Sequence, residues 1–284
     1  MHATAHRMTT IAEDLPAMPE ALRRFVAAQP LHRFTDTRGL AWSLRDTGAH
    51  GDTAIAEPPP LVLLPGALGN GDSAWRIAQA FAAERRVLSI TYPGGVAPEL
   101  LALGLEELLR ERRTGAVALW ASSYGAWWAQ AFALRFPDQV AALWLGNTFV
   151  DGCDVAQHPL FDALWLAASD SATVIARWGQ ALRARPDDLL RAVQLHMLHA
   201  GLPASDFHGR LRQVAGAAEL PAPHAIANTV VFECEDDAII APATRARVRA
   251  RYPKARHLAQ AQGGHYPHIV KAELLVERMR DWLQ

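Results

Sequence analysis

The segment from residue 116 to residue 125 constrains the fold more than any other part of this chain. It reads Ala-Val-Ala-Leu-Trp-Ala-Ser-Ser-Tyr-Gly, an apolar stretch that runs directly into serine between small residues. Helix-forming residues follow, so the pattern predicts a buried strand, a tight turn and a helix. A turn of this kind can present a serine hydroxyl at the end of a sheet, and the segment therefore predicts a nucleophilic serine.

Short apolar runs alternate with helical patterns along most of the chain. Strands are predicted at Leu31–Phe34, Leu40–Leu44, Leu61–Leu64, Val87–Thr91, Ala116–Ala121, Val140–Leu145, Thr229–Cys234 and Arg256–Ala261. Helices are predicted at Pro19–Gln29, Ser73–Ala83, Pro98–Arg113, Tyr124–Phe136, Pro242–Tyr252 and Pro267–Leu283. Because the later apolar runs are continuous rather than alternating, we expect strands buried on both faces, in a mostly parallel α/β sheet flanked by helices.

The alternation of strands and helices stops between Thr148 and Ile226. This stretch contains several helical patterns and no convincing strand. We predict a core made of residues 1–148 and 227–284, with residues 149–226 inserted as a helical cap after the fourth long parallel strand. Such an insertion is expected to lie over the carboxyl ends of the strands, where α/β sheets bind ligands.

The serine pair at the end of the predicted strand has to be resolved into one candidate. A sharp strand-to-helix turn packs the residues two before and two after the nucleophile against neighbouring strands, so both must be small. These residues are Ala121 and Gly125 for Ser123, whereas Ser122 has Trp120 and Tyr124 at the same spacing. The pattern therefore favours Ser123, although a serine without a catalytic role in a strand-end turn is the alternative.

An acid and a histidine follow the serine in an order that supports catalysis. Asp237 comes after the strand Thr229–Cys234, and His265 lies between the last strand and the last helix. We choose Asp237 over Asp236 because Asp237 directly precedes an apolar Ala-Ile-Ile run. A solvated turn residue or a helix N-cap is the alternative for either acid.

These three residue types can act as a unit. A serine hydroxyl is a weak nucleophile that needs a base within hydrogen-bond reach. Neutral histidine can take its proton near pH 7, and a carboxylate can fix the histidine tautomer.

A glycine-rich loop after the strand Leu61–Leu64 supplies candidate oxyanion donors. The loop reads Pro-Gly-Ala-Leu-Gly-Asn-Gly from residue 65 to residue 71. We expect the backbone N–H groups of Ala67 and Tyr124 to face the developing negative charge. A phosphate-binding loop is the alternative, but the stretch lacks the Lys-Ser/Thr ending and does not fit G-x-G-x-x-G.

Overall composition narrows the class of partner. Half of the 284 residues are hydrophobic, which is enough for a substantial core. The formal net charge is −1, so we expect no nucleic-acid partner. The uncharged run Gly115–Leu134 has the length of a membrane span, but a buried strand, turn and helix give the same run. We expect no membrane span and a small-molecule acyl substrate, and we leave the oligomeric state open.

Cysteine and histidine usage argues against disulfides and metals. Cys153 and Cys234 are well separated, which is typical of free thiols in a reducing compartment. The twelve histidines form no H-E-x-x-H motif, so we expect no metal, and the proposed chemistry needs no cofactor. The stretch Met1–Asp14 lacks the apolar run of a secretory signal, and we therefore expect a cytoplasmic protein.

Several short segments resemble a known family. They are Trp42-Ser43-Leu44-Arg45-Asp46-Thr47-Gly48, Pro60-Leu61-Val62-Leu63-Leu64-Pro65, Leu145-Gly146-Asn147-Thr148-Phe149, Tyr252-Pro253-Lys254-Ala255-Arg256 and Gly263-Gly264-His265-Tyr266-Pro267. With them the chain resembles the α/β-hydrolase superfamily over nearly its whole length, and maspardin-like α/β-hydrolases most. The resemblance implies a mostly parallel sheet of about eight strands with a helical cap, and catalytic Ser123, Asp237 and His265.

Two departures from the family pattern leave the reacting groups in place. The His-Gly common before the oxyanion loop is Pro65-Gly66, and Ala121 replaces a glycine. We expect a serine hydrolase that cleaves a carboxylic ester, thioester or lactone through an acyl-enzyme on Ser123. Because maspardin-like proteins are associated with protein binding, a non-catalytic interaction module is an alternative, as is an acyltransferase, a C–C bond hydrolase or a lyase of the same fold.

The substrate pocket is the least readable part of the sequence. We expect Leu68, Trp165, Trp178 and Tyr266 to line it, with packing in the core as the alternative for the two tryptophans.

Overall fold

The structure is a computed structural model that describes residues 18–48 and 58–284. Within these ranges, eight strands form one sheet in the order β1-β2-β4-β3-β5-β6-β7-β8. The strands are β1 (Leu31–Thr35), β2 (Ala41–Asp46), β3 (Leu61–Leu64), β4 (Val87–Thr91), β5 (Val117–Ser122), β6 (Val140–Gly146), β7 (Thr229–Cys234) and β8 (Arg256–Gln260). Strands β3 to β8 pair in parallel with one another, and β2 pairs antiparallel with β1 and β4. The predicted fold class is confirmed.

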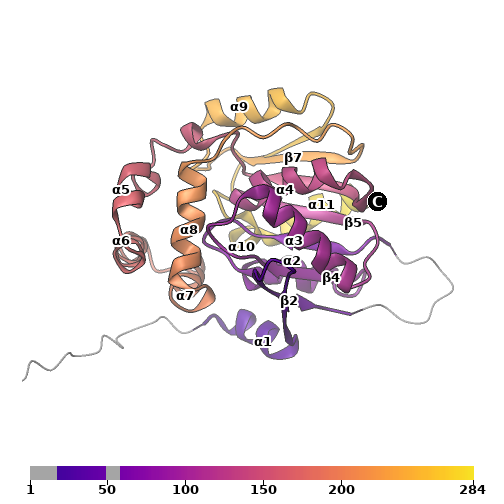
Figure 1. Ribbon diagram of the computed structural model, residues 1–284, viewed down its shortest axis with the longest axis horizontal. Coiled ribbons are helices and arrows are strands. Elements are labelled where there is room, and N and C mark those ends of the chain that lie inside the picture. The colour runs from indigo at the N-terminus through magenta and orange to yellow at the C-terminus, as the bar shows by residue number, and fades with distance from the viewer. Residues whose placement is uncertain (1–17, 49–57) are drawn as a thin grey trace, which may run out of the picture.

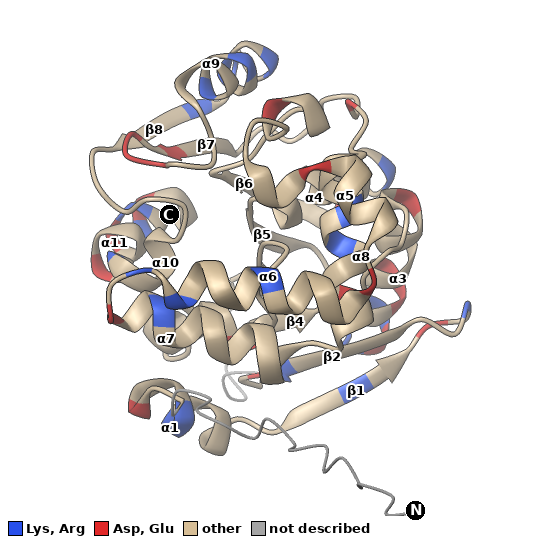
Figure 2. Ribbon diagram, turned by 90° about the vertical axis from the view of Figure 1, so that its left-hand side faces the viewer, with Lys and Arg blue, Asp and Glu red and all other residues tan. Residues whose placement is uncertain are grey.

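Helices cover both faces of this sheet. They are α1 (Glu20–Ala28), α2 (Trp75–Phe81), α3 (Pro98–Glu111), α4 (Tyr124–Arg135), α5 (Ala163–Ala168), α6 (Ser171–Arg183), α7 (Leu189–His196), α8 (Ala204–Ala215), α9 (Pro242–Arg251), α10 (Pro267–Val270) and α11 (Ala272–Leu283). Figure 2 shows α3 and α4 on one side of the sheet and α10 and α11 on the other. Helix α3 packs on α4, and α2 packs on α11.

Burial explains why the central strands read as continuous apolar runs. Every residue of β3 and β5 is buried, because helices lie over both faces of these strands. Trp120, Trp128 and Trp144 are buried in this layer, each at most 2% exposed. Burying large aromatic side chains in this layer contributes about 2 kcal/mol or more for each, which fixes the strands that carry the candidate site.

The chain between β6 and β7 contains helices α5 to α8 and no strand. Figure 1 shows these helices together beside one end of the sheet, apart from α3, α4 and α11. We call residues 149–226 the helical insertion. Helix α8 lies against the chain after β4, where Gly94 has no room for a Cβ beside the Asp206 backbone.

Two predicted helices differ in detail from those observed. The region Ser73–Ala83 begins as a short 3-10 helix, η1 (Gly71–Ala74), and continues as α2. The predicted helix Pro267–Leu283 is two helices, because Lys271 leaves the helical conformation between α10 and α11. The Ile269 carbonyl accepts a hydrogen bond from Arg76 (2.7 Å), which gives it a partner outside the helix.

Some predictions concern features away from the site. Cys153 and Cys234 are both unpaired, as predicted. Among the described residues, no helix is both long and apolar enough to cross a bilayer. The segment Met1–Asp14 lies outside the described residues.

Candidate active site

Ser123 occupies a strained turn between β5 and α4. Its backbone adopts φ 54° and ψ −124°, a conformation that residues other than glycine rarely take. The Ser123 N–H donates to the Gly146 carbonyl (2.8 Å), and the Ser123 carbonyl accepts from the Thr148 hydroxyl (3.0 Å). Strain of this kind costs about 1–3 kcal/mol, and these bonds from the end of β6 hold the turn in place.

Close packing around the turn explains why its neighbours are small. A Cβ on Gly125 would lie 2.5 Å from the Leu64 carbonyl oxygen and would also collide with that of Pro65. A Cβ on Gly66 would lie 3.1 Å from the Ser123 Cβ. The turn therefore sits directly against the end of β3 and the loop that follows it, as the choice of Ser123 over Ser122 required.

Ser123, His265 and Asp237 form one chain of hydrogen bonds. His265 Nε2 lies 2.8 Å from Ser123 Oγ, and His265 Nδ1 lies 2.8 Å from Asp237 Oδ2. Because the carboxylate accepts, the proton resides on Nδ1 and Nε2 is free to accept from the serine hydroxyl. The structure thus brings together the three residues selected from the sequence, and Asp237 rather than Asp236 contacts the histidine.

The acid is arranged to remain ionised. Burial by itself raises the pKa of Asp237, but His265 and the backbone N–H groups of Ile240 and Ile239 outweigh burial and lower that pKa below its usual value. The two N–H groups donate to Asp237 Oδ1 at 3.0 Å and 2.8 Å. The other carboxylate oxygen is left to accept from the imidazole.

Asp236 and Asn147 shape the loop that carries His265. Asp236 accepts from the N–H groups of Gly263 (3.1 Å) and Gly264 (2.7 Å), both of which have positive φ. Asn147 donates to the Gly264 carbonyl (2.8 Å) and accepts from the Cys234 N–H (3.0 Å), which ties this loop to β7. The sequence left open whether Asp236 orients this loop, and sequence reasoning missed the role of Asn147. The signals for Asn147 were its position directly after a predicted strand and its place in the segment Leu145-Gly146-Asn147-Thr148-Phe149.

The loop after β3 lies beside Ser123. A Cβ on Gly66 would be 3.6 Å from Ser123 Oγ, so the backbone that leads into Ala67 runs next to this candidate nucleophile. Tyr124 follows Ser123 directly, at the first position of α4. Within residues 18–48 and 58–284, no hydrogen bond uses the N–H of Ala67 or of Tyr124 as donor. Both groups are therefore open to a ligand, as an oxyanion site requires.

Arg210, for which sequence reasoning predicted no role, fixes this loop from the helical insertion. It is 0% exposed on α8 and donates to the carbonyls of Ala67 (3.3 Å), Gly69 (2.7 Å) and Tyr92. Its guanidinium also lies 3.9 Å from the centre of the Tyr92 ring. The Tyr92 hydroxyl in turn donates to the Pro65 carbonyl (2.6 Å). Carbonyls and an aromatic face thus surround a buried cation, and no carboxylate in the described chain pairs with it.

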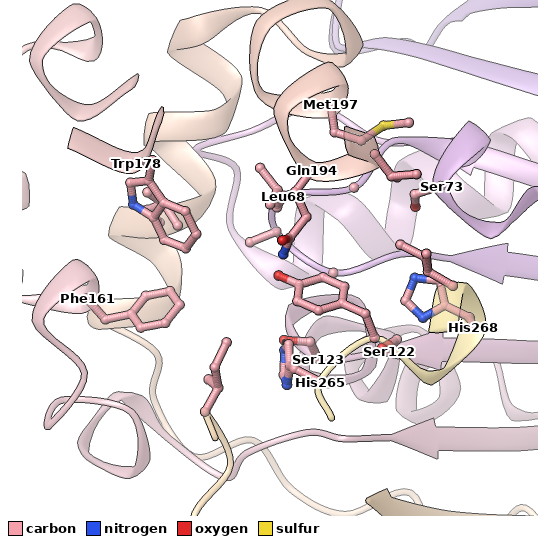
Figure 3. A pocket seen from close by; sticks show the side chains of 18 residues that line it. Leu68, Ser73, Ser122, Ser123, Phe161, Trp178, Gln194, Met197, His265 and His268 are labelled. Carbon is pink, nitrogen blue, oxygen red and sulfur yellow. Dashed lines mark hydrogen bonds between the residues drawn. The ribbon is translucent and has the colours of Figure 1, made fainter. Parts of the chain in front are cut away.

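Two adjoining cavities meet at this site. The inner cavity is lined by Ser123, Leu68 and Trp178 and offers about 30 Å³ to the centres of water molecules (Figure 3). The outer cavity, lined by His158, Arg185 and Gly264, offers about 390 Å³. His265, Tyr266, Gln194, Ile239 and Trp178 line both cavities.

Of the four residues expected in the pocket, the structure places three there. Leu68 and Trp178 line the inner cavity, as does Tyr266. Trp165 lines neither cavity: its half-buried ring lies beneath the Arg177 guanidinium, 4.1 Å from it, and packs against the hydrophobic core. A helical pattern places Trp165 in the insertion but does not say which face meets the core. Within the described residues, no three His, Cys, Asp or Glu side chains form a group that could hold a metal ion.

Comparison with known proteins agrees with this architecture. A model of the alpha/beta hydrolase family matches residues 61–278. A hydrolase from Pseudomonas aeruginosa PA01 has a similar structure, with a TM-score of 0.69 and 18% identity over 89% of this chain and 98% of that one. An enol-lactonase from Burkholderia xenovorans LB400 has a TM-score of 0.67 and 16% identity, covering 89% and 99%. A thermophilic esterase from Thermogutta terrifontis has a TM-score of 0.65 and 20% identity, covering 90% and 97%. No curated protein matches significantly.

Proposed function

Because this chain belongs to the alpha/beta hydrolase family, we propose that it is a serine hydrolase that cleaves a carboxylic ester, thioester or lactone. One observation carries the proposal. The Ser123 hydroxyl, the His265 imidazole and the Asp237 carboxylate are joined by two hydrogen bonds of 2.8 Å, at the wall of a cavity. Solved structures of the same fold include proteins described as an esterase and an enol-lactonase, which agrees with acyl chemistry.

The geometry supports a two-step reaction. His265 Nε2 takes the Ser123 proton as Oγ attacks the acyl carbon, and the carbonyl oxygen becomes an oxyanion. The imidazolium then returns the proton to the leaving oxygen or sulfur, which leaves an acyl group on Ser123. Water, deprotonated by His265, attacks this acyl-enzyme and releases the acid. Asp237 stays ionised throughout and stabilises the imidazolium.

The oxyanion is held by the N–H groups of Ala67 and Tyr124 in this proposal. Removal of one such donor in comparable sites costs about 10²–10³ in kcat, so the position of the loop matters as much as the triad. The helical insertion, which we propose to be a cap, closes the site and selects the substrate. No metal or organic cofactor takes part in these steps.

A serine-reactive fluorophosphonate probe tests the proposal. We expect covalent labelling of the wild-type protein on the peptide that contains Ser123, detected by mass spectrometry, and loss of labelling in Ser123→Ala and His265→Ala. Ser89→Ala provides a matched control, because Ser89 is a buried serine on β4 outside the site. An unlabelled, folded wild-type protein would contradict catalysis and favour the interaction module that the maspardin-like resemblance implies.

A screen over short esters, thioesters and lactones then identifies the acyl class. Addition of a competing alcohol or amine separates hydrolysis from acyl transfer, since transfer forms a new ester or amide in place of the free acid.

A further inference from the structure

Two polar side chains at the inner cavity have no hydrogen-bond partner among residues 18–48 and 58–284. His268, on α10, is 3% exposed, and its Nδ1 is buried without a partner. Ser122, the last residue of β5, is 4% exposed, and its hydroxyl likewise has no described partner. Both residues line the inner cavity. A buried polar group without a partner is costly, so the orphaned Nδ1 of His268, beside a serine hydroxyl that is free to bond, indicates a ligand that supplies the missing bonds.

The His268 imidazole is directed into the cavity. In Figure 3 it projects from α10 toward the interior, on the same side as Ser122 and Ser73. The His268 ring packs edge to face with Trp120, with 5.4 Å between the centroids and 70° between the planes, and this contact fixes the imidazole against β5. The Ser73 hydroxyl donates to the Asn70 carbonyl (2.8 Å), so toward the cavity it can only accept.

This end of the cavity is polar but uncharged. Burial, and then the neighbouring His265, lower the pKa of His268 to about 3, so the imidazole is neutral at pH 7, with one N–H donor and one acceptor nitrogen. No Lys or Arg is among the described residues that line the inner cavity. A carboxylate or phosphate would find no counter-charge there, whereas a hydroxyl or keto oxygen matches a hydroxyl and a neutral imidazole.

The other end of the cavity is apolar. Phe161 and Trp178 pack edge to face, with 5.9 Å between their ring centroids, and Figure 3 shows them on the side opposite to His268. The free volume of about 30 Å³ accommodates about two water molecules. A long acyl chain does not fit this space as it stands.

We propose that the inner cavity is an acyl subsite for short acyl groups that carry an uncharged hydroxyl or keto oxygen, which His268 and Ser122 bind. The subsite rests on the proposed hydrolase function. The position of the leaving group decides which cavity holds the acyl group. His265 protonates the leaving atom, so the leaving group lies toward the outer cavity, which His265 and Gly264 also line. Ser122 and His268 line only the inner cavity, and this places the acyl group beside them.

The test compares three methyl esters of equal chain length: butyrate, 3-hydroxybutyrate and 3-oxobutyrate. Acid release is followed by titration at constant pH, and each kcat/KM is divided by the rate of alkaline hydrolysis of the same ester, which removes intrinsic reactivity. We expect the wild-type protein to prefer one oxygenated ester over butyrate by at least tenfold. Methyl octanoate should be cleaved more slowly than methyl butyrate.

Variants separate a binding role from a structural one. In His268→Phe the oxygenated-to-plain ratio should fall toward one, whereas His268→Gln, which keeps a donor and an acceptor, should retain part of it. If His268→Phe does not fold, judged by its thermal transition, Ser122→Ala provides the same measurement. Ser89→Ala is the matched control and should keep the wild-type ratio.

The outcomes distinguish this proposal from the one on which it rests. Cleavage of butyrate as fast as of both oxygenated esters, with Ser123 labelled by the fluorophosphonate, overturns the subsite alone. The same conclusion follows if a folded His268→Phe keeps the full preference, or if a labelled protein cleaves none of the three esters. Absence of both labelling and cleavage overturns the hydrolase function and the subsite together.

Discussion

Replacing Arg210 by methionine should weaken both stability and catalysis, because this side chain joins the helical insertion to the candidate oxyanion loop. Arg210 is 0% exposed and donates to the carbonyls of Ala67, Gly69 and Tyr92. Methionine preserves much of the apolar stem and its volume but removes the donors and the charge. Three buried carbonyl oxygens then lose the guanidinium that now satisfies them.

The expected magnitude follows from opposing contributions. Each carbonyl left without a donor costs about 1–3 kcal/mol, and loss of the cation–π contact with Tyr92 adds up to about 2 kcal/mol. Relief of the desolvation of a buried cation returns several kcal/mol. The free energy of unfolding should therefore fall by about 3 kcal/mol, which lowers Tm by about 5 °C in a protein of this size.

Catalysis should decline for a separate reason. The Ala67 carbonyl belongs to the peptide unit directly after the proposed donor N–H, so release of this carbonyl lets the donor move. A misplacement of about 1 Å can cost about 10²-fold in rate. We expect kcat to fall about 10- to 100-fold at 15 °C below the variant's Tm, with KM changed less than about threefold, because the lost interaction acts on the transition state.

A neighbouring arginine supplies the control. Arg212 lies two residues further along α8 and is exposed, and Arg212→Met should change stability by less than about 0.5 kcal/mol. Arg210→Lys should recover part of the stability but little of kcat, since one ammonium cannot span three carbonyls. Wild-type Tm and kcat in Arg210→Met would refute the argument that Arg210 positions the loop.

Three further changes give distinct outcomes. Gly125→Ala drives a Cβ into the carbonyls of Leu64 and Pro65. It should lower the free energy of unfolding by more than about 2 kcal/mol and slow fluorophosphonate labelling. An unchanged Tm would contradict the packing argument. Asp237→Asn should lower kcat about 10³- to 10⁴-fold at pH 7 with the fold intact, and a loss below tenfold would remove Asp237 from the triad. Because the pKa of His268 is lowered to about 3 in the folded protein, the unfolded chain binds the extra proton first, and stability falls as pH drops from about 6.5 toward 3. Between pH 6.5 and 5, the free energy of unfolding measured with urea should fall by about 1.5 kcal/mol less in His268→Phe than in the wild-type protein. An equal pH dependence in the two proteins would show that His268 is not buried as a neutral group.

The sequence predicted the sheet and the triad because both follow from short-range patterns. Continuous apolar runs identify strands that are buried on both faces, and β3 and β5 are buried along their whole length. In a parallel sheet the carboxyl ends of the strands share one edge, so a serine, an acid and a histidine that each follow a strand are brought near one another. Chain order and the residues next to each candidate were therefore sufficient to select Ser123, Asp237 and His265.

Side-chain direction within the helical insertion could not be predicted in the same way. Trp165 and Trp178 have similar patterns, yet Trp165 is half-buried beneath Arg177 and lines neither cavity, whereas Trp178 lines both. Next to the break between α10 and α11, the Ile269 carbonyl accepts a hydrogen bond from Arg76, which is almost two hundred residues away in the sequence. No local pattern contains a contact of this range.

Arg210 shows most clearly what a sequence pattern omits. From the sequence, an arginine in α8 is expected to be exposed to solvent, since a buried arginine is rare without a carboxylate partner. Its partners are instead backbone carbonyls, which every residue possesses and which therefore leave no trace in composition. Close backbone contact allows this arrangement, because Gly209 meets Gly95 where a Cβ would not fit. The absence of a side chain at Gly209, directly before Arg210, thus lets the insertion approach the sheet closely enough for the Arg210 side chain to bond to the candidate oxyanion loop. Substitutions in α8 are therefore expected to alter kcat as well as stability.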